Sequence, residues 1–225
     1  AVAPFGMVQL SPDTDATCTV RDCYGHAAGY RHDDPTIQGF SHTHFSGAGH
    51  SDLGDFLIMP VSGDTVKLEP GSSDDPDSGY RSRFSHDGEV AQPGYYAVTL
   101  SDYGVRAEMT AGTRIGVHRY TFPADKAAHL VFDLRTSLYN YPGKTLWSSM
   151  RLRDDSTMTG CRQTRGWAPD RKLCFAISFS QPLIAHRFVS TEKDVTYTGF
   201  QGPGRGTDAV EAKAGRALVA QLDFG

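Results

Sequence analysis

Apolar and polar residues alternate with a period of two along much of this chain. The alternation is clearest in two runs that are joined by a turn at residues 102–104. The apolar positions of these runs are Tyr96, Val98, Leu100, Val105, Ala107 and Met109. Because successive side chains of a β-strand point to opposite faces, this spacing predicts antiparallel strands with one buried face and one solvated face.

Further short strands are predicted on both sides of this pair. They cover residues 4–10, 39–45, 56–59, 65–68, 80–84, 89–91, 114–122, 130–134, 145–153, 157–165, 173–179, 184–189, 195–200 and 216–224. The Asp87-Gly88 pair favours a tight hairpin between residues 80–84 and 89–91. The best helical candidate is a single turn at residues 124–128. Many short strands with turn signals between them indicate an all-β fold, a large antiparallel β-sandwich with little or no helix.

Length and charge agree with one domain and argue against some partners. A chain of 225 residues is within the usual range of a single all-β domain. The net charge is -4 and no basic stripe is present, so nucleic acid is not expected as a partner. No apolar run approaches the roughly 20 residues that span a bilayer. The N-terminus has no charged and then apolar signal, so we expect that any signal peptide was removed or not included.

Four cysteines bear on the cellular compartment. They are Cys18, Cys23, Cys161 and Cys174, and their spacing matches neither a zinc ribbon nor a redox pair. One bridge could close a tight loop at residues 18–23 and another could join adjacent strands at residues 161–174. Four cysteines allow three connectivities, and four reduced thiols are the alternative. Disulfides persist in oxidising compartments, so bridges would favour export.

The most polar candidate site lies at residues 36–60. His42, His44, His50, Asp52 and Asp55 are close together there, with glycines between them. Such side chains are costly to bury without partners, and a mixture of this kind is typical of a site carried on a loop. If residues 39–45 are extended, the first two histidines project to one face. They could bond to neighbouring carbonyl groups, or they could bind a metal ion as in small β-barrel metalloenzymes of the cupin type.

Two tryptophans are candidates for sugar binding. Trp147 and Trp167 could each offer an aromatic face to a sugar ring. A tryptophan in a strand more often packs in the core or at a sheet edge, and we favour that interpretation for both.

The sequence resembles glycoside hydrolase family 92, the calcium-dependent α-mannosidases. The matching residues are Pro4-Phe5-Gly6-Met7-Val8-Gln9-Leu10-Ser11-Pro12-Asp13, Gly29-Tyr30, Gly39-Phe40-Ser41-His42-Thr43-His44-Phe45-Ser46-Gly47, Asp52, Gly54, Asp55, Met59-Pro60, Glu89 and Pro93-Gly94-Tyr95-Tyr96. The order and spacing of these blocks make the match specific. It is detailed over the first ~100 residues and holds in outline over the rest.

The resemblance implies a fold, an activity and a cofactor. It implies that residues 1–225 are an N-terminal β-sandwich domain and that a catalytic helical (α/α)6 barrel domain is expected C-terminal to it. The activity implied is that of an inverting, exo-acting α-mannosidase that hydrolyses terminal α-mannosides of mannans or N-glycans. The acid and base carboxylates and most Ca²⁺ ligands would belong to the helical domain, so this domain alone is expected to be inactive. Secretion or a cell-surface location is expected.

The resemblance also places one wall of the active site on this chain. The candidate residues are Ser46, Gly47, Gly49, His50, Ser51 and Asp52, at the interface with the helical domain, with His42, His44 and Asp55 as supporting residues. Many family members carry Cys at the position of His50. A partly protonated imidazole would suit an anionic leaving group such as a mannosyl phosphate. The alternative is that His50 only packs at the interface.

A function of a different class is also open. β-Sandwiches serve as stand-alone carbohydrate-binding or adhesion modules as well, and a fold does not decide between these functions. A stand-alone module would not need the loop of histidines and glycines directed at a neighbouring domain, and it would show no large exposed apolar patch where a partner domain should sit.

Overall fold

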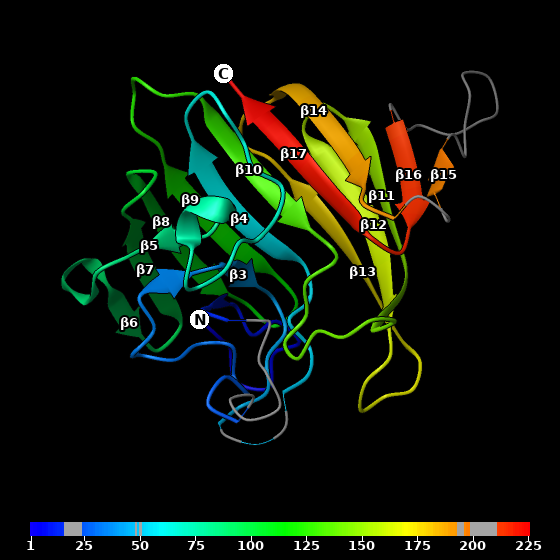
Figure 1. Ribbon diagram of the computed structural model, residues 1–225, viewed down its shortest axis with the longest axis horizontal. Coiled ribbons are helices and arrows are strands. Elements are labelled where there is room, and N and C mark those ends of the chain that lie inside the picture. The colour runs from blue at the N-terminus through cyan, green and yellow to red at the C-terminus, as the bar shows by residue number, and fades with distance from the viewer. Residues whose placement is uncertain (16–23, 48, 50, 193–195, 199–210) are drawn as a thin grey trace.

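The computed structural model describes residues 1–15, 24–47, 49, 51–192, 196–198 and 211–225. The regular secondary structure of these residues is almost entirely β-strand (Figure 1). The described helices are two short 3-10 turns, η1 (Pro76–Ser78) and η2 (His86–Gly88). The predicted all-β class is therefore confirmed. No helix within the described ranges is long and apolar enough to cross a membrane.

The main sheet has six antiparallel strands drawn from the whole length of the chain. Its order is β1-β3-β4-β10-β17-β14. The bounds are β1 (Ser11–Asp13), β3 (Gly39–Ser41), β4 (Leu57–Ser62), β10 (Ala128–Asp133), β17 (Leu218–Phe224) and β14 (Leu183–Ser190). Residues 221–224 of β17 therefore lie beside residues of β10 that are ninety or more positions earlier in the sequence.

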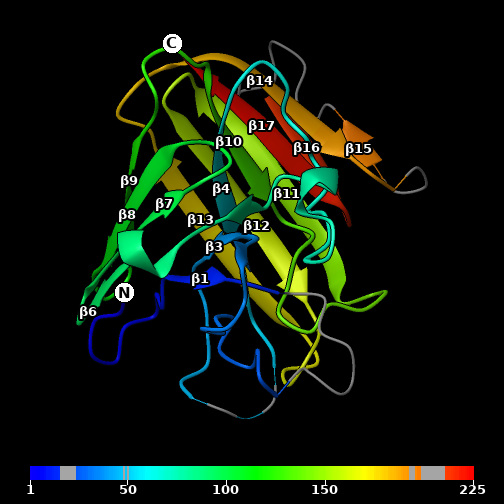
Figure 2. The same ribbon diagram turned by 60° about the vertical axis from the view of Figure 1, so that its left-hand side comes forward.

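Three further sheets complete the fold (Figure 2). A five-stranded sheet has the order β13-β12-β11-β16-β15, with bounds Arg171–Ser178, Thr157–Thr164, Thr145–Asp154, Glu211–Gly215 and Thr196–Thr198. A four-stranded sheet has the order β6-β7-β8-β9, with bounds Val90–Gln92, Tyr95–Leu100, Val105–Ala111 and Gly116–Thr121. The short strands β2 (Thr36–Ile37) and β5 (Ser82–Arg83) form a pair.

The central strands of the main sheet contribute to two apolar cores. In β4, Met59 belongs to a core shared with the four-stranded sheet, whereas Ile58 belongs to a core shared with the five-stranded sheet. In β10, Val131 and Phe132 divide in the same way. Since neighbouring side chains of a strand point to opposite faces, both faces of these strands are buried. This explains why the sequence of β4 reads as a continuous apolar run rather than as an alternation.

Two predicted strands, at residues 4–10 and 65–68, are absent from the structure. Within residues 4–10 only Gln9 takes part in a β-bridge, to Val2, and the first strand, β1, begins at Ser11. The reason is local, because Phe5 has a left-handed backbone with φ 55° that no strand accommodates. Residues 65–68 are also not a strand.

The predicted hairpin at residues 80–91 is also wrong. β5 pairs with β2, and β6 pairs with β7 through the Pro93-Gly94 turn. The residues between β5 and β6 form η2 instead of a tight turn, because the Ser85 hydroxyl accepts a hydrogen bond from the Asp87 backbone N–H. The single helical turn expected at residues 124–128 is a non-helical turn that leads into β10.

One predicted disulfide is present. Cys161 in β12 lies directly opposite Cys174 in β13, and the two are bonded. The second candidate pair, Cys18 and Cys23, lies outside the described residues.

Candidate functional site

A pocket of about 480 Å³ opens beside the central polar stretch of the sequence. Its lining residues are Asp52, Tyr139, Tyr141, Lys144, Gly166 and Trp167. They come from three loops, one before β4, one between β10 and β11, and one between β12 and β13. The pocket therefore depends on all three loops being held in place together.

Aromatic rings dominate the open side of this pocket. Trp167 is 69% exposed, so the interpretation of this side chain as core packing is wrong. The rings of Tyr139 and Tyr141 lie 5.7 Å apart, and the Lys144 ammonium lies 5.5 Å from the second ring. Trp147, by contrast, is half-buried in β11, as expected of a packing residue. Exposed aromatic faces beside polar groups are typical of sites that bind polar ligands with an apolar face.

The buried base of the pocket is an ion pair. The side chains of Asp52 and Lys144 are 5% and 2% exposed and bond directly to each other. The Asp52 carboxylate also accepts hydrogen bonds from the backbone N–H groups of Leu53 at 2.8 Å and Trp167 at 2.9 Å. Burial by itself raises the pKa of this carboxyl, but the bonds from Lys144 and the two N–H groups outweigh burial and lower the pKa. Asp52 is therefore a fixed carboxylate at neutral pH.

Gly166 is required for this arrangement. A Cβ atom built on this glycine would overlap both carboxylate oxygens of Asp52. A larger residue would thus push the carboxylate away from the Trp167 N–H. The sequence Gly-Trp at residues 166–167 lets the backbone approach the carboxylate closely and exposes the indole ring.

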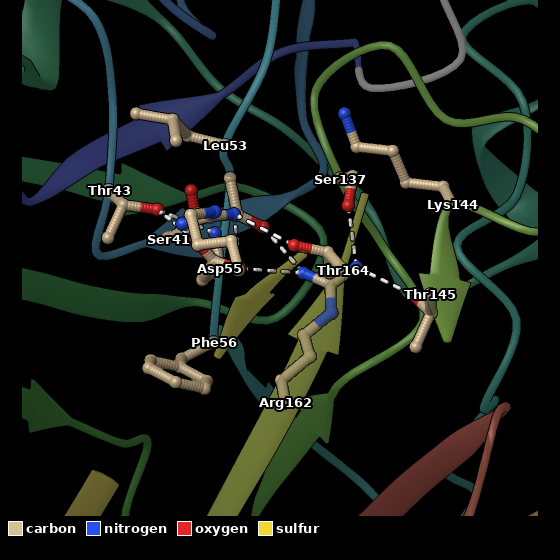
Figure 3. A network of polar contacts seen from close by, with 12 residues as sticks. Ser41, Thr43, Leu53, Asp55, Phe56, Ser137, Lys144, Thr145, Arg162 and Thr164 are labelled. Carbon is tan, nitrogen blue, oxygen red and sulfur yellow. Dashed lines mark hydrogen bonds and ion pairs between the residues drawn. The ribbon is translucent and has the colours of Figure 1, made fainter. Parts of the chain in front are cut away.

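A second buried carboxylate, Asp55, fixes the polar loop to the five-stranded sheet (Figure 3). Its oxygens lie 3.3 Å from the Arg162 guanidinium in β12 and 2.7 Å from that of Arg171 in β13. The Thr43 hydroxyl donates a further bond at 2.5 Å. Burial raises the pKa of Asp55, but the two guanidinium charges outweigh it and lower the pKa.

The backbone around these aspartates is strained. Leu53 and Phe56 have φ values of 75° and 59°, in the left-handed region that side chains disfavour. Such residues cost about 1–3 kcal/mol each and persist only where the surroundings hold them. The bonds of Asp52 and Asp55 are among the contacts that hold this segment.

The two histidines of the stretch have separate partners. His44 bonds through Nδ1 to the Gln9 carbonyl at 2.6 Å and through Nε2 to the Asp13 carboxylate at 2.7 Å. Burial lowers the pKa of His44, but the Asp13 charge and hydrogen bond outweigh it and raise the pKa. The ring therefore ties the start of the chain to the polar loop, and no ring nitrogen is left to bind a ligand.

His42 belongs to a different chain of hydrogen bonds. Its Nδ1 lies 2.7 Å from the Phe56 carbonyl and its Nε2 lies 3.0 Å from Nε2 of His118. The Tyr120 hydroxyl lies 2.7 Å from Nδ1 of His118. Because Nδ1 of His42 must donate to the carbonyl, its Nε2 accepts from His118, whose Nδ1 accepts from the tyrosine. Burial lowers the pKa of His42 to about 4, so both rings are neutral at pH 7.

The metal-binding interpretation of the His-x-His pair gains no support from this geometry. Within the described residues, no three His, Cys, Asp or Glu side chains come together in a way that could hold a metal ion.

Comparison with known proteins identifies the family. A sequence model of the glycosyl hydrolase family 92 N-terminal domain matches residues 1–224. The chain belongs to this family. The resemblance drawn from the sequence blocks between residues 4 and 96 is thereby confirmed.

Solved structures of family 92 enzymes share the fold. The family GH92 alpha-mannosidase BT3965 from Bacteroides thetaiotaomicron is 44% identical over 98% of this chain, with a TM-score of 0.83. The family GH92 inverting mannosidase BT2199 from Bacteroides thetaiotaomicron VPI-5482 is 25% identical over 99% of this chain, with a TM-score of 0.69. This chain covers 28% and 26% of those chains, respectively.

A curated relative matches over a shorter range. It is an uncharacterized secreted glycosidase from Arthroderma benhamiae, 30% identical over 130 residues, which are 56% of this chain and 15% of the relative. The family 92 domain described here thus spans about a quarter or less of the length of these relatives.

The predicted site residues of this family 92 domain do not all lie in the pocket. Asp52 lines it, and Ser51 is buried beside it in the sequence. Ser46, Gly47 and Gly49 are exposed and are not among its lining residues. His50 lies outside the described residues. His42, His44 and Asp55 bond to other protein groups, and the supporting roles expected of them stay a prediction.

Sequence reasoning missed most of the pocket. No role was predicted for Tyr139 and Tyr141, although two tyrosines beside a Pro-Gly pair could have indicated a partly exposed aromatic surface. No sequence pattern marks Lys144 or Gly166 as part of a site, because their roles depend on Asp52, which is about ninety or more residues away in the sequence.

Proposed function

We propose that this family 92 domain forms one wall of the active site of an inverting, exo-acting α-mannosidase, at an interface with a C-terminal helical domain of the same protein. The substrates are terminal α-mannosides of mannans or N-glycans. The observation that carries the proposal is the pocket at Asp52, in a chain 44% identical to an alpha-mannosidase over 98% of its length. Sites at domain interfaces are common, which supports placing the wall there.

The pocket has the chemistry to hold a sugar ring. A carboxylate offers about four lone-pair directions, and three of those of Asp52 are taken by Lys144, Leu53 and Trp167. The remaining direction can accept a hydrogen bond from a sugar hydroxyl. The exposed Trp167 ring can cover the apolar face of the sugar. A few fixed polar groups would orient the sugar in the pocket, and the aromatic surface would provide the contact area with it.

The two aspartates of the loop are unsuited to the acid and base roles. An inverting glycosidase uses one carboxylic acid with a raised pKa and one carboxylate that activates water, about 6.5–9.5 Å apart. Asp52 and Asp55 both have lowered pKa values and both are bound to cationic side chains. We therefore place the acid and the base outside this chain, and this domain alone is inactive.

Calcium belongs to the same proposal but not to these residues. The resemblance to calcium-dependent mannosidases implies the ion, and the described residues do not form a cluster that would hold it. Its ligands would lie in the helical domain, where calcium would position sugar hydroxyls.

The protein is proposed to be secreted or displayed at the cell surface. The disulfide between Cys161 and Cys174 and the secreted relative support an extracytoplasmic location. Mannose-containing glycans, including mannosyl phosphate linkages, are the proposed ligands.

Mannose release tests the assignment. We would measure it from α-linked mannosides, with calcium and with a chelator, for residues 1–225 and for the longer protein. Release by the longer protein only, abolished by the chelator, is the expected result. Release by residues 1–225 alone would show that the catalytic carboxylates are in this chain. Activity in neither form would favour a stand-alone carbohydrate-binding or adhesion module.

Two substitutions in the longer protein test the pocket itself. Trp167→Ala should raise KM about tenfold through loss of the sugar contact, whereas the matched change Trp147→Ala in β11 should leave KM unchanged once folding is verified. An unchanged KM in the Trp167 variant would remove the pocket from the active site.

His50→Cys tests leaving-group preference. If His50 contacts an anionic leaving group, the ratio of activity on phosphate-linked to plain mannosides should fall in the variant. An unchanged ratio would leave His50 with a packing role only.

A further inference from the structure

An apolar groove of about 1180 Å³ is lined by residues of β9 and β13. Each of these strands is at the end of its sheet, so within the described part of the chain each has one paired neighbour, β8 and β12 respectively. The groove is therefore bounded by two strand edges whose outer backbone N–H and C=O groups face away from any described strand.

The floor of the groove is a hydrophobic core that the described residues leave incomplete. Phe56, Leu130 and Phe132 belong to this core and line the groove. In β13 the side chains facing the core, such as Phe175 and Ile177, are only half-buried, and no residue of this strand is fully buried. The interior strand β8, by contrast, alternates fully buried residues with more exposed ones. The apolar surface between β9 and β13 thus lacks the covering that the rest of the core has.

The two strand edges carry few of the features that protect edges in natural proteins. β9 and β13 are six and eight residues long, contain no proline and pair with their neighbours without a register shift. Exposed edges of this kind invite pairing with another strand, so proteins usually cover them. A helix laid in the groove would cover the apolar floor but would leave the edge N–H and C=O groups without partners.

We propose that an extended segment of the same polypeptide, from outside residues 1–225, lies in this groove as an added β-strand. It pairs with the free edge of β13 or β9 and directs alternate apolar side chains toward Phe132 and Phe175. A strand matched to these edges has about six to eight residues, at ~3.3 Å each. Addition of a strand to a free edge is a common mode of recognition.

Two observations favour the protein's own polypeptide over a separate partner. The family 92 enzymes that share this fold are much longer, because this chain covers only 28% and 26% of them. Phe224 and Gly225 line the groove, so residues joined to Gly225 would begin beside it. A second copy or an unrelated protein would have to compete with a segment that is already tethered there.

Photocrosslinking in the longer protein tests the proposal without use of the catalytic activity. Ile177 would be replaced by the photoreactive residue benzoyl-phenylalanine, and Leu173 would serve as a second position if the first variant did not fold. Lys172, which is exposed on the opposite side of β13, is the matched control position. The expected result is an intramolecular crosslink from Ile177 to a segment outside residues 1–225 and none from Lys172. A crosslink within residues 1–225, a crosslink to a second molecule, or no crosslink would overturn the proposal.

Amide hydrogen exchange separates a strand from other coverings. If a strand is added, the amides of β9 or β13 that do not face β8 or β12 should exchange at least a hundredfold more slowly than in an unstructured peptide. Unprotected amides on both edges, together with a crosslink, would mean that a helix or loop covers the groove, which would also refute the proposed strand. Because neither measurement depends on mannose release, its outcome is independent of the proposed function.

Discussion

The paired imidazoles of His42 and His118 should make the domain less stable in mild acid. Burial lowers the pKa of His42 from 6.5 to about 4 and lowers that of His118 in the same direction. Because the folded domain then binds fewer protons than the unfolded chain between these values, stability falls as the pH falls from 6.5 to 4. A pKa difference of about 2.5 corresponds to roughly 3 kcal/mol for His42 alone, of which about 2 kcal/mol is already lost at pH 5.

The assay is urea unfolding of the parent and of His42→Asn at pH 7 and pH 5. The variant should be less stable at pH 7, but its further loss between pH 7 and pH 5 should be smaller than that of the parent by roughly 2 kcal/mol. His32→Asn is the control, because the His32 side chain is 74% exposed, and this change should leave the pH dependence as it is. An equal loss in the parent and in His42→Asn would refute the reasoning, since the titrating group would then lie elsewhere.

Three further predictions concern stability. Replacing Cys161 and Cys174 by serine opens a closed loop with a sequence separation of 13 and should cost about 3 kcal/mol in urea unfolding, an effect that a reductant should reproduce in the parent. Arg162→Met leaves the buried Asp55 with one cation fewer and should cost about 3–5 kcal/mol; a cost below 1 kcal/mol would show that the pair is not needed. Gly54→Ala places a side chain at φ 75° and 2.7 Å from a neighbouring backbone nitrogen, so a clear drop in Tm is expected and an unchanged Tm would contradict this geometry.

The sequence was most informative where local chemistry decides the structure. The alternation from Tyr96 to Met109 predicted β7 and β8 well, because the two strands are neighbours in the sequence and bury one face. The prediction of strand pairing failed where the partners are far apart in the sequence, as for β5, whose partner β2 is more than forty positions away. The absence of a strand at residues 4–10 could not be predicted, since the left-handed backbone at Phe5 has no sequence signal comparable to a glycine.

The candidate site was predictable in part for the same reason. The residue types around Asp52 and Asp55 marked the polar loop correctly, because buried carboxylates need partners. The partners themselves, Arg162 and Lys144, come from other strands and loops about ninety or more residues away, so only the fold brings them in. The exposure of Trp167 likewise follows from the close approach at Gly166 rather than from the tryptophan itself.

The position of β17 has a consequence for how the chain folds. This strand lies at residues 218–224, after all the other strands of residues 1–225 that the structure describes, yet it is inside the main sheet between β10 and β14. Synthesis must therefore proceed beyond residue 217 before β14 gains its neighbour in that sheet and before β10 gains its second neighbour. Long-range pairing of this kind slows folding and leaves strand edges exposed meanwhile. The main sheet is therefore completed only when the seven residues Leu218–Phe224 insert between β10 and β14.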